Sequence, residues 1–85
     1  MVSFDYIIKS QNGLHARPAG LLVKAAQACS SVITVKNKEN EADAKRLFAV
    51  IGLNTKEGDT LSFSISGKDE EKDSEKIKSF CREYL

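Results

Sequence analysis

Three features are scarce in this 85-residue sequence: net charge, cysteine and long apolar segments. The 13 Lys and Arg residues nearly balance the 12 Asp and Glu residues, so a net charge of +1 gives no global argument for nucleic-acid or membrane binding. The longest apolar runs are far too short to span a bilayer, and no signal peptide is expected because Met1 leads directly into a strand pattern. We therefore expect residues 1–85 to form one small cytoplasmic domain.

The two cysteines, Cys29 and Cys81, lack the spacing of metal ligands. Each falls on the apolar stripe of a predicted helix, which favours buried free thiols. If these helices run antiparallel, the two cysteines lie at opposite ends and are too far apart for a disulfide. The sequence thus predicts no metal site and no crosslink.

The special residues gather instead in one segment, Asn12 to Gly20, which reads N-G-L-H-A-R-P-A-G. It holds the only His, the only Pro and two of the five Gly. Gly13 permits a turn with positive φ, and Pro18 is tolerated in the first turn of a helix. The segment therefore predicts a turn, His15 as N-cap, and a helix from about Ala16 to Ala28.

A neutral imidazole at a helix N-terminus favours nucleophilic chemistry. The dipole of the helix disfavours imidazolium, which keeps His15 neutral at pH 7. A phosphoryl group on the ring would gain the backbone N–H groups of Ala16 and Arg17 and the Arg17 guanidinium as donors. This stabilisation is modest, about 0.3–1 kcal/mol, which suits a group that must be passed on. The spacing alone leaves open that His15 only caps the helix or packs in the loop.

Periodicity predicts the element order β-α-β-β-α-β-α. Strands are expected over residues 2–8, 32–36, 41–44 and 60–66, with helices over 16–28 and 46–53 and at the C-terminus. Four strands with one apolar face and three helices to cover it make a two-layer α/β sandwich with an antiparallel sheet. The first helix should bury a stripe of small and apolar residues: Ala19, Leu22, Val23, Ala26 and Cys29.

The two later helices carry more specific expectations. In the short helix, Leu47, Val50 and either Ile51 or Leu53 should point inward and leave Phe48 at the surface. Asn54 can adopt the left-handed conformation that ends this helix. The last helix has an apolar stripe of Ile77, Phe80, Cys81, Tyr84 and Leu85. Its acidic start reads as a solvated face without a function: Asp69, Glu70, Glu71, Asp73 and Glu75.

The segment G-L-H-A-R-P-A-G-L-L-V-K resembles the active-site segment of HPr, the histidine-containing phosphocarrier family of the bacterial phosphoenolpyruvate-dependent sugar phosphotransferase system. The resemblance extends along the chain to its length, to K-R-L-F at Lys45 to Phe48, to the E-G-D turn and to the final amphipathic helix. It implies an open-faced sandwich with strand order 1-4-2-3 and the helices on one side.

The resemblance also implies a function. His15 would accept a phosphoryl group on ring Nδ1 from phosphorylated enzyme I and donate it to a sugar-specific enzyme IIA, with Arg17 beside it. The protein would be a stoichiometric carrier, a cytoplasmic monomer without metal or cofactor, rather than an enzyme with its own turnover. Both partners would dock transiently on Gly20, Lys24, Leu47, Phe48 and Ile51. A basic rim of Arg17, Lys24, Lys45 and Arg46 would face their acidic surfaces.

One position departs from part of the family, because Gram-positive HPr proteins carry a regulatory serine where this sequence has Arg46. Arginine cannot be phosphorylated by the HPr kinase, so regulation through phosphoserine is in doubt. Two other hypotheses stand beside the carrier: a purely regulatory or binding paralogue of the same fold, and an unrelated anion-binding or hydrolase domain. The retained His15 argues against the first, and the lack of a second catalytic group nearby argues against the second.

Overall fold

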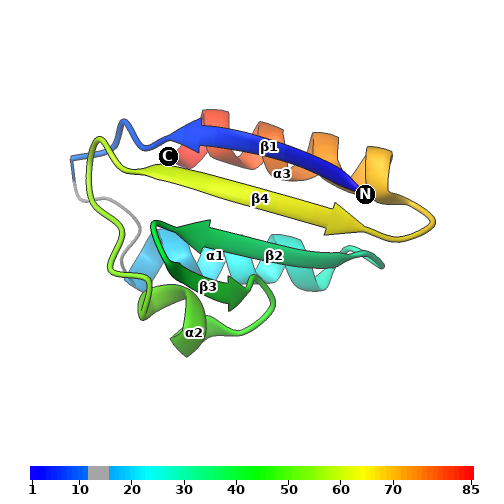
Figure 1. Ribbon diagram of the computed structural model, residues 1–85, viewed down its shortest axis with the longest axis horizontal. Coiled ribbons are helices and arrows are strands. Elements are labelled where there is room, and N and C mark those ends of the chain that lie inside the picture. Colours follow the sequence, from blue (N-terminus) through cyan, green and yellow to red (C-terminus); the bar gives the residue numbers. More distant parts are fainter. Residues whose placement is uncertain (12–15) are drawn as a thin grey trace.

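The computed structural model describes residues 1–11 and 16–85. The elements follow the predicted order: β1 (Val2–Ile7), α1 (Ala16–Gln27), β2 (Val32–Asn37), β3 (Asn40–Asp43), α2 (Leu47–Ile51), β4 (Thr60–Ser66) and α3 (Glu70–Tyr84). The four-stranded antiparallel sheet lies in front of α1 and α3 in Figure 1, with β1 at one rim and β3 at the other.

The strand order β1-β4-β2-β3 confirms the order that the family resemblance implied. Central β4 pairs with β1 on one side and with β2 on the other, and Phe63 lies opposite both Phe4 and Val35. The apolar residues of β4 alternate with hydroxyl residues, so Leu61, Phe63 and Ile65 are buried on the helix side. The opposite face of the sheet carries the hydroxyl residues of β4, and also the exposed apolar residues Ile7 and Val32.

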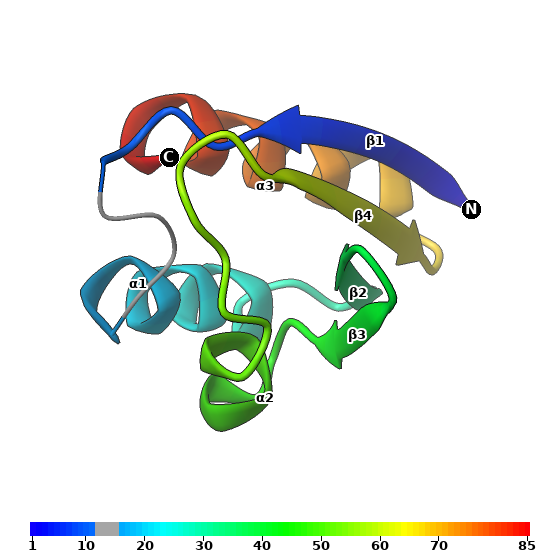
Figure 2. The ribbon, with the colours of Figure 1, turned by 60° about the vertical axis from the view of Figure 1, so that its left-hand side comes forward.

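Helix α1 packs against both α2 and α3, and Figure 2 shows α2 directly below α1. Its predicted apolar stripe is confirmed, because all five of its members are buried. Cys29 and Cys81 are buried and free, as expected. Helices α1 and α3 run in opposite directions behind the sheet (Figure 1), so each thiol lies toward a different end.

The prediction that Leu47 points inward is wrong, because its exposed fraction is 37%. Helix α2 has only five residues, so it offers the core little more than one turn. Val50 of this helix and Leu53 after it pack into the core, whereas Leu47 at the first helical position stays outside the core. Asn54 has φ 51°, which confirms the left-handed residue after this helix.

The acidic start of α3 was also misassigned in part, since Asp73 is buried rather than solvated. One oxygen of its carboxylate accepts hydrogen bonds from the Ser31 hydroxyl at 2.6 Å and from the Ser31 N–H at 3.1 Å. At the other end of α3, Tyr84 is 45% exposed and not part of the buried stripe. Its ring instead packs on Phe80, with 4.8 Å between the ring centroids.

Candidate functional site

The site predicted from the sequence lies at the start of α1. This helix begins at Ala16, as predicted, and Pro18 occupies its first turn. The first turn contains no acidic side chain that would neutralise the positive end of the helix dipole, and Arg17 is exposed there. The turn at Gly13 and the His15 N-cap were predictions on residues outside the described ranges. The described part of the site is thus a helix start that exposes a guanidinium.

The chain that enters this site is held at two places. The Ile8 N–H donates to the Asp59 carbonyl at 2.9 Å, and the Gly58 N–H donates back to the Ile8 carbonyl at 2.8 Å. The N–H groups of Lys9 and Ser10 both donate to the carbonyl oxygen of Leu85, at 2.7 and 3.0 Å. Residues 8–10 are therefore fixed to the turn before β4 and to the end of α3.

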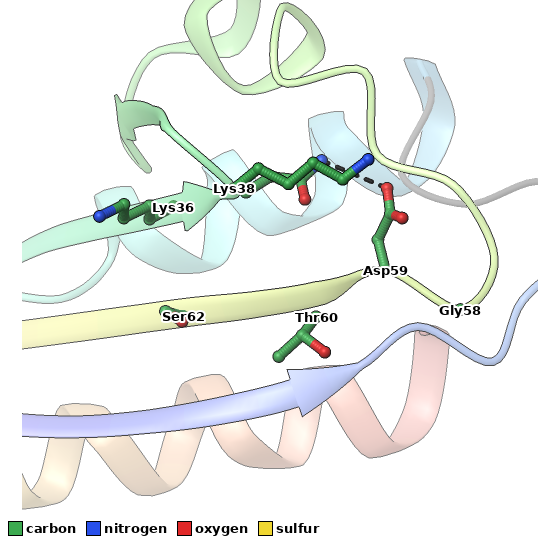
Figure 3. A pocket seen from close by; sticks show the side chains of 7 residues that line it. Lys36, Lys38, Gly58, Asp59, Thr60 and Ser62 are labelled. Carbon is green, nitrogen blue, oxygen red and sulfur yellow. Dashed lines mark hydrogen bonds between the residues drawn. The ribbon is translucent and has the colours of Figure 1, made fainter.

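The turn before β4 is itself fixed by the Asp59 carboxylate, which accepts hydrogen bonds from the Lys56 N–H at 2.9 Å and from Asn37 Nδ2 at 3.3 Å. The bond from the Lys56 N–H is the main reason that the pKa of Asp59 is lowered. Gly58 adopts φ 89°, which favours glycine. Asp59 and Gly58 line an open hollow of about 460 Å³ together with Lys36, Lys38 and Thr60, and Figure 3 shows the Lys36 side chain extending away from Asp59.

A second part of the predicted site lies on the exposed sides of α1 and α2. On α1, Arg17, Leu21 and Lys24 follow the i, i+4, i+7 spacing of one helix face, and all three are exposed. On α2, Phe48 is 85% exposed, which confirms that its side chain is at the surface. We call these residues, together with Gly20, Leu47 and Ile51, the α1–α2 surface. Leu21 was not predicted for it, although its position one residue from Gly20 could have indicated it.

The two helices of the α1–α2 surface are tied together through Lys45. Gln27 Nε2 donates to the Lys45 carbonyl, and Lys45 Nζ donates to the Cys29 carbonyl after α1, each at 3.0 Å. The ammonium group thus lies against the negative end of the α1 dipole. Lys45 was predicted as part of a basic rim; its side chain is half-buried, and one of its three donors binds the Cys29 carbonyl. Ile51 is likewise half-buried and packs against the core.

Gly20 is not required by packing within the chain. A Cβ atom built at this position meets no described atom within 4 Å. A glycine within a helix costs about 1 kcal/mol relative to alanine. A reason for this glycine must therefore be sought outside the described chain, in a partner that approaches closely, or in simple tolerance.

Arg46 is the N-cap residue of α2, in extended conformation with φ −117°. No side-chain hydrogen bond caps the helix at this position. A serine hydroxyl would accept a hydrogen bond from the first turn, whereas the guanidinium has only donors. The sequence departure at Arg46 therefore leaves α2 without the cap that serine would provide.

The thiols do not add a nucleophile to the site. Burial raises the pKa of Cys81 to about 12, and burial is also the main reason that the pKa of Cys29 is raised. Over residues 1–11 and 16–85, no cluster of three or more His, Cys, Asp or Glu side chains could hold a metal ion. Within the same ranges, none of the helices is both long and apolar enough to cross a membrane.

Comparison with known proteins decides the family of this chain. The sequence profile described as "PTS HPr component phosphorylation site" matches residues 2–83. The chain is 45% identical over 71 residues to the phosphocarrier protein HPr of Haemophilus influenzae, and the match covers 84% of each chain. This chain belongs to the HPr family.

The structural comparison agrees. The crystal structure of HPr-C-His from Thermoanaerobacter tengcongensis superposes with a TM-score of 0.91 at 32% identity, and covers 96% of this chain and 92% of that one. The chain is also 41% identical over 73 residues to multiphosphoryl transfer protein 1 of Escherichia coli K12, where the match covers 84% of this chain and 9% of the relative. HPr-like sequences thus occur both as short chains and inside long phosphotransferase proteins.

Proposed function

We propose that residues 1–85 act as one phosphocarrier domain of the phosphotransferase system, with His15 as the phosphorylated residue. A ring nitrogen of His15 forms the new N–P bond as the phosphoryl group leaves phosphorylated enzyme I. The N–P bond breaks when the phosphoryl group passes to an enzyme IIA. This transfer returns His15 to its neutral, unphosphorylated form. The chain is then a stoichiometric carrier without a turnover of its own.

The observation that carries this proposal is the start of α1. Its first turn has no acidic side chain, its N–H groups and Arg17 supply donors, and it follows His15 directly in the sequence. The contrast with α3, whose first turn holds three acidic residues, makes α1 the helix start that favours an external anion. A phosphohistidine dianion fits this environment.

We further propose the α1–α2 surface as the docking site for both partners. Phe48, Leu47 and Leu21 offer exposed apolar area, and the cations around them are Arg17, Lys24 and Arg46. Binding should be transient and weaken at high salt, since it relies on exposed charges. With Arg46 in place of serine, this surface has no hydroxyl for a kinase at the start of α2. A cytoplasmic monomer agrees with this role.

The test is phosphorylation with phosphoenolpyruvate and a bacterial enzyme I, followed by phosphorus NMR and an acid-stability assay. We expect one acid-labile phosphoryl group on the wild-type chain and none on His15→Ala. The variant should keep its circular dichroism spectrum and melting temperature, and Gln11→Ala, at an exposed neighbouring position, serves as the matched control. Labelling of His15→Ala would refute the site.

The second candidate function is a regulatory or binding paralogue of the same fold. It would be favoured if several different enzymes I left the folded wild-type chain unlabelled. Binding of such a chain to a partner through the α1–α2 surface would then be measured without phosphate.

A further inference from the structure

The outer edge of β1 pairs with no other strand among the described residues. This strand lies at the rim of the sheet (Figure 1), and its pairing with β4 runs without a bulge from Val2 opposite Ile65 to Ile7 opposite Thr60. Its six residues include no Pro or Lys, which commonly block an edge, and its one charged side chain is Asp5. The other edge strand, β3, has only four residues, and two of these are acidic. The β1 edge is thus the one that could template another strand.

A hollow of about 360 Å³ runs between this edge and α3, and we call it the β1–α3 groove. Its aromatic part is held in place, because the Phe4 ring stacks on buried Phe63 with 5.0 Å between centroids. Lys78 Nζ lies 5.3 Å from the centroid of the Phe4 ring. The groove is lined by Phe4, Asp5, Tyr6, Lys9, Lys78 and Arg82.

The charges of the groove are unequal, with three cations and one carboxylate. Asp5 alternates with Phe4 and Tyr6 along β1, so it belongs to the open face of the sheet rather than to the helix side. Among the described residues, Lys78 has one carboxylate neighbour, Glu75 at 3.5 Å, and Arg82 contacts the Ser79 hydroxyl at 3.4 Å. The helix side of the groove therefore favours an anionic occupant.

We propose that the β1–α3 groove binds an extended acidic segment of another protein, which adds a fifth strand to the sheet at β1. Backbone hydrogen bonds to the free edge would supply the pairing, and side chains at alternate positions would face α3. Acidic residues at those positions would meet Lys78 and Arg82, while apolar residues between them would lie beside Ile7, which is 57% exposed. A segment of six residues, about 20 Å long, matches the length of β1.

Charge complementarity selects this occupant over a second copy of the chain. The β1 strand itself carries one carboxylate, Asp5, so a second β1 would leave most of the groove cations unpaired. The groove also lies away from the α1–α2 surface, since β1 and α2 are at opposite margins of Figure 1. The chain could therefore hold an acidic segment while it exchanges a phosphoryl group.

The probe is an acetylated six-residue peptide that alternates glutamate with valine, titrated into the ¹⁵N-labelled chain at low ionic strength. We expect chemical-shift changes in the amides of residues 2–9 and 78–84. The glutamate peptide should bind at least about tenfold more tightly than its glutamine counterpart, because exposed cations are weakly screened at low salt. Two further peptides carry N-methyl groups at either the odd or the even positions. In an added strand only alternate N–H groups face β1, so one of these two peptides should lose binding and the other should keep it.

Variants of α3 isolate the role of charge. Lys78→Gln combined with Arg82→Gln should abolish the preference for glutamate, whereas Lys72→Gln combined with Lys76→Gln, on exposed positions of the same helix, should keep it. The wild-type chain and both double variants should be phosphorylated by enzyme I at the same rate, which separates this proposal from the carrier function. The proposal is wrong if millimolar peptide leaves residues 2–9 unshifted, or if a lysine–valine peptide binds equally well. Shifts in β1 that grow with protein concentration alone would assign the edge to a second copy instead.

Discussion

The first turns of α1 and α3 differ in the number of acidic side chains that they carry. The first turn of α1 has no acidic side chain and exposes Arg17, whereas the first turn of α3 holds Glu70, Glu71 and Asp73. Both helix starts carry the positive end of a helix dipole. At α3 the chain's own carboxylates lie beside that end, whereas the first turn of α1 has none. In our proposal the same dipole serves stability at α3 and holds a phosphoryl group at α1.

The carboxylates of α3 also join this helix to the loop between α1 and β2. Asp69 accepts a hydrogen bond from the Ser30 hydroxyl at 3.0 Å, and Asp73 accepts two from Ser31. Gly67, which precedes α3, lies so close that a Cβ there would be 3.0 Å from both the Ser31 Cα and its hydroxyl oxygen. If the comparison is right, changes here should affect folding and spare transfer, and changes near α1 should do the reverse.

The largest effect is expected for Asp73→Ala. It leaves the buried Ser31 hydroxyl and N–H without their acceptor, which costs about 2–3 kcal/mol of unfolding free energy. For a domain of this size the melting temperature should fall by about 10–20 °C. Calorimetry measures this loss, and transfer per folded molecule at 20 °C should be unchanged. Glu71→Ala, at an exposed position in the same turn, should change stability by less than about 0.5 kcal/mol.

Part of the Asp73 effect depends on pH. The hydrogen bond from the Ser31 hydroxyl is the main reason that the pKa of Asp73 is lowered in the folded chain. The ionised Asp73 carboxylate therefore stabilises the fold fully at pH values above its pKa in the unfolded chain, near 3.8. This stabilisation is lost as the pH falls through the lower pKa of Asp73 in the folded chain. The gap in melting temperature between wild type and Asp73→Ala should narrow between pH 6 and pH 3. A constant gap would mean that the loss is only one of packing.

The Phe48→Ala change tests the other side of the comparison. Because Phe48 is 85% exposed, its removal should change the melting temperature by less than about 3 °C. It should lower kcat/KM for phosphorylation by enzyme I about tenfold, equivalent to about 1.4 kcal/mol of lost docking energy. Lys38→Ala, at an exposed position outside this surface, is the control. Equal losses of stability and transfer would place Phe48 in the core.

The smallest effect is expected for Gly20→Ala. Here stability should rise while kcat/KM with enzyme I falls. Since a Cβ meets no described atom within 4 Å, the helix should gain about 0.5–1 kcal/mol. If a partner approaches at this position, kcat/KM with enzyme I falls by a few-fold at the same time. Thermal unfolding and transfer kinetics of the same sample give both values. A more stable variant with unchanged kinetics would show that this glycine is merely tolerated.

Local patterns in the sequence determined much of this protein. The alternation in residues 60–66 predicted β4, and the spacing of Ala19, Leu22 and Val23 predicted the buried face of α1. Asn54 does adopt the expected left-handed conformation, although α2 already ends at Ile51. These features depend on periods of two and 3.6 residues and on backbone preferences of single residues, so neighbours in sequence are sufficient to encode them. The family resemblance added the strand order, which periodicity cannot supply.

Tertiary structure alone decided what happens where segments distant in sequence meet. Asp73 lies in an acidic run that is typical of a solvated helix face. Only the packing of Ser31, 42 residues away in sequence, makes its carboxylate a buried hydrogen-bond acceptor. Leu47 fits an inward stripe, but a five-residue helix leaves it exposed. Lys45 has the charge of a basic rim, and only the fold directs its ammonium group to the Cys29 carbonyl. The sequence predicts which residues can be buried or charged; the fold decides which of them find a partner, because that depends on distances through space.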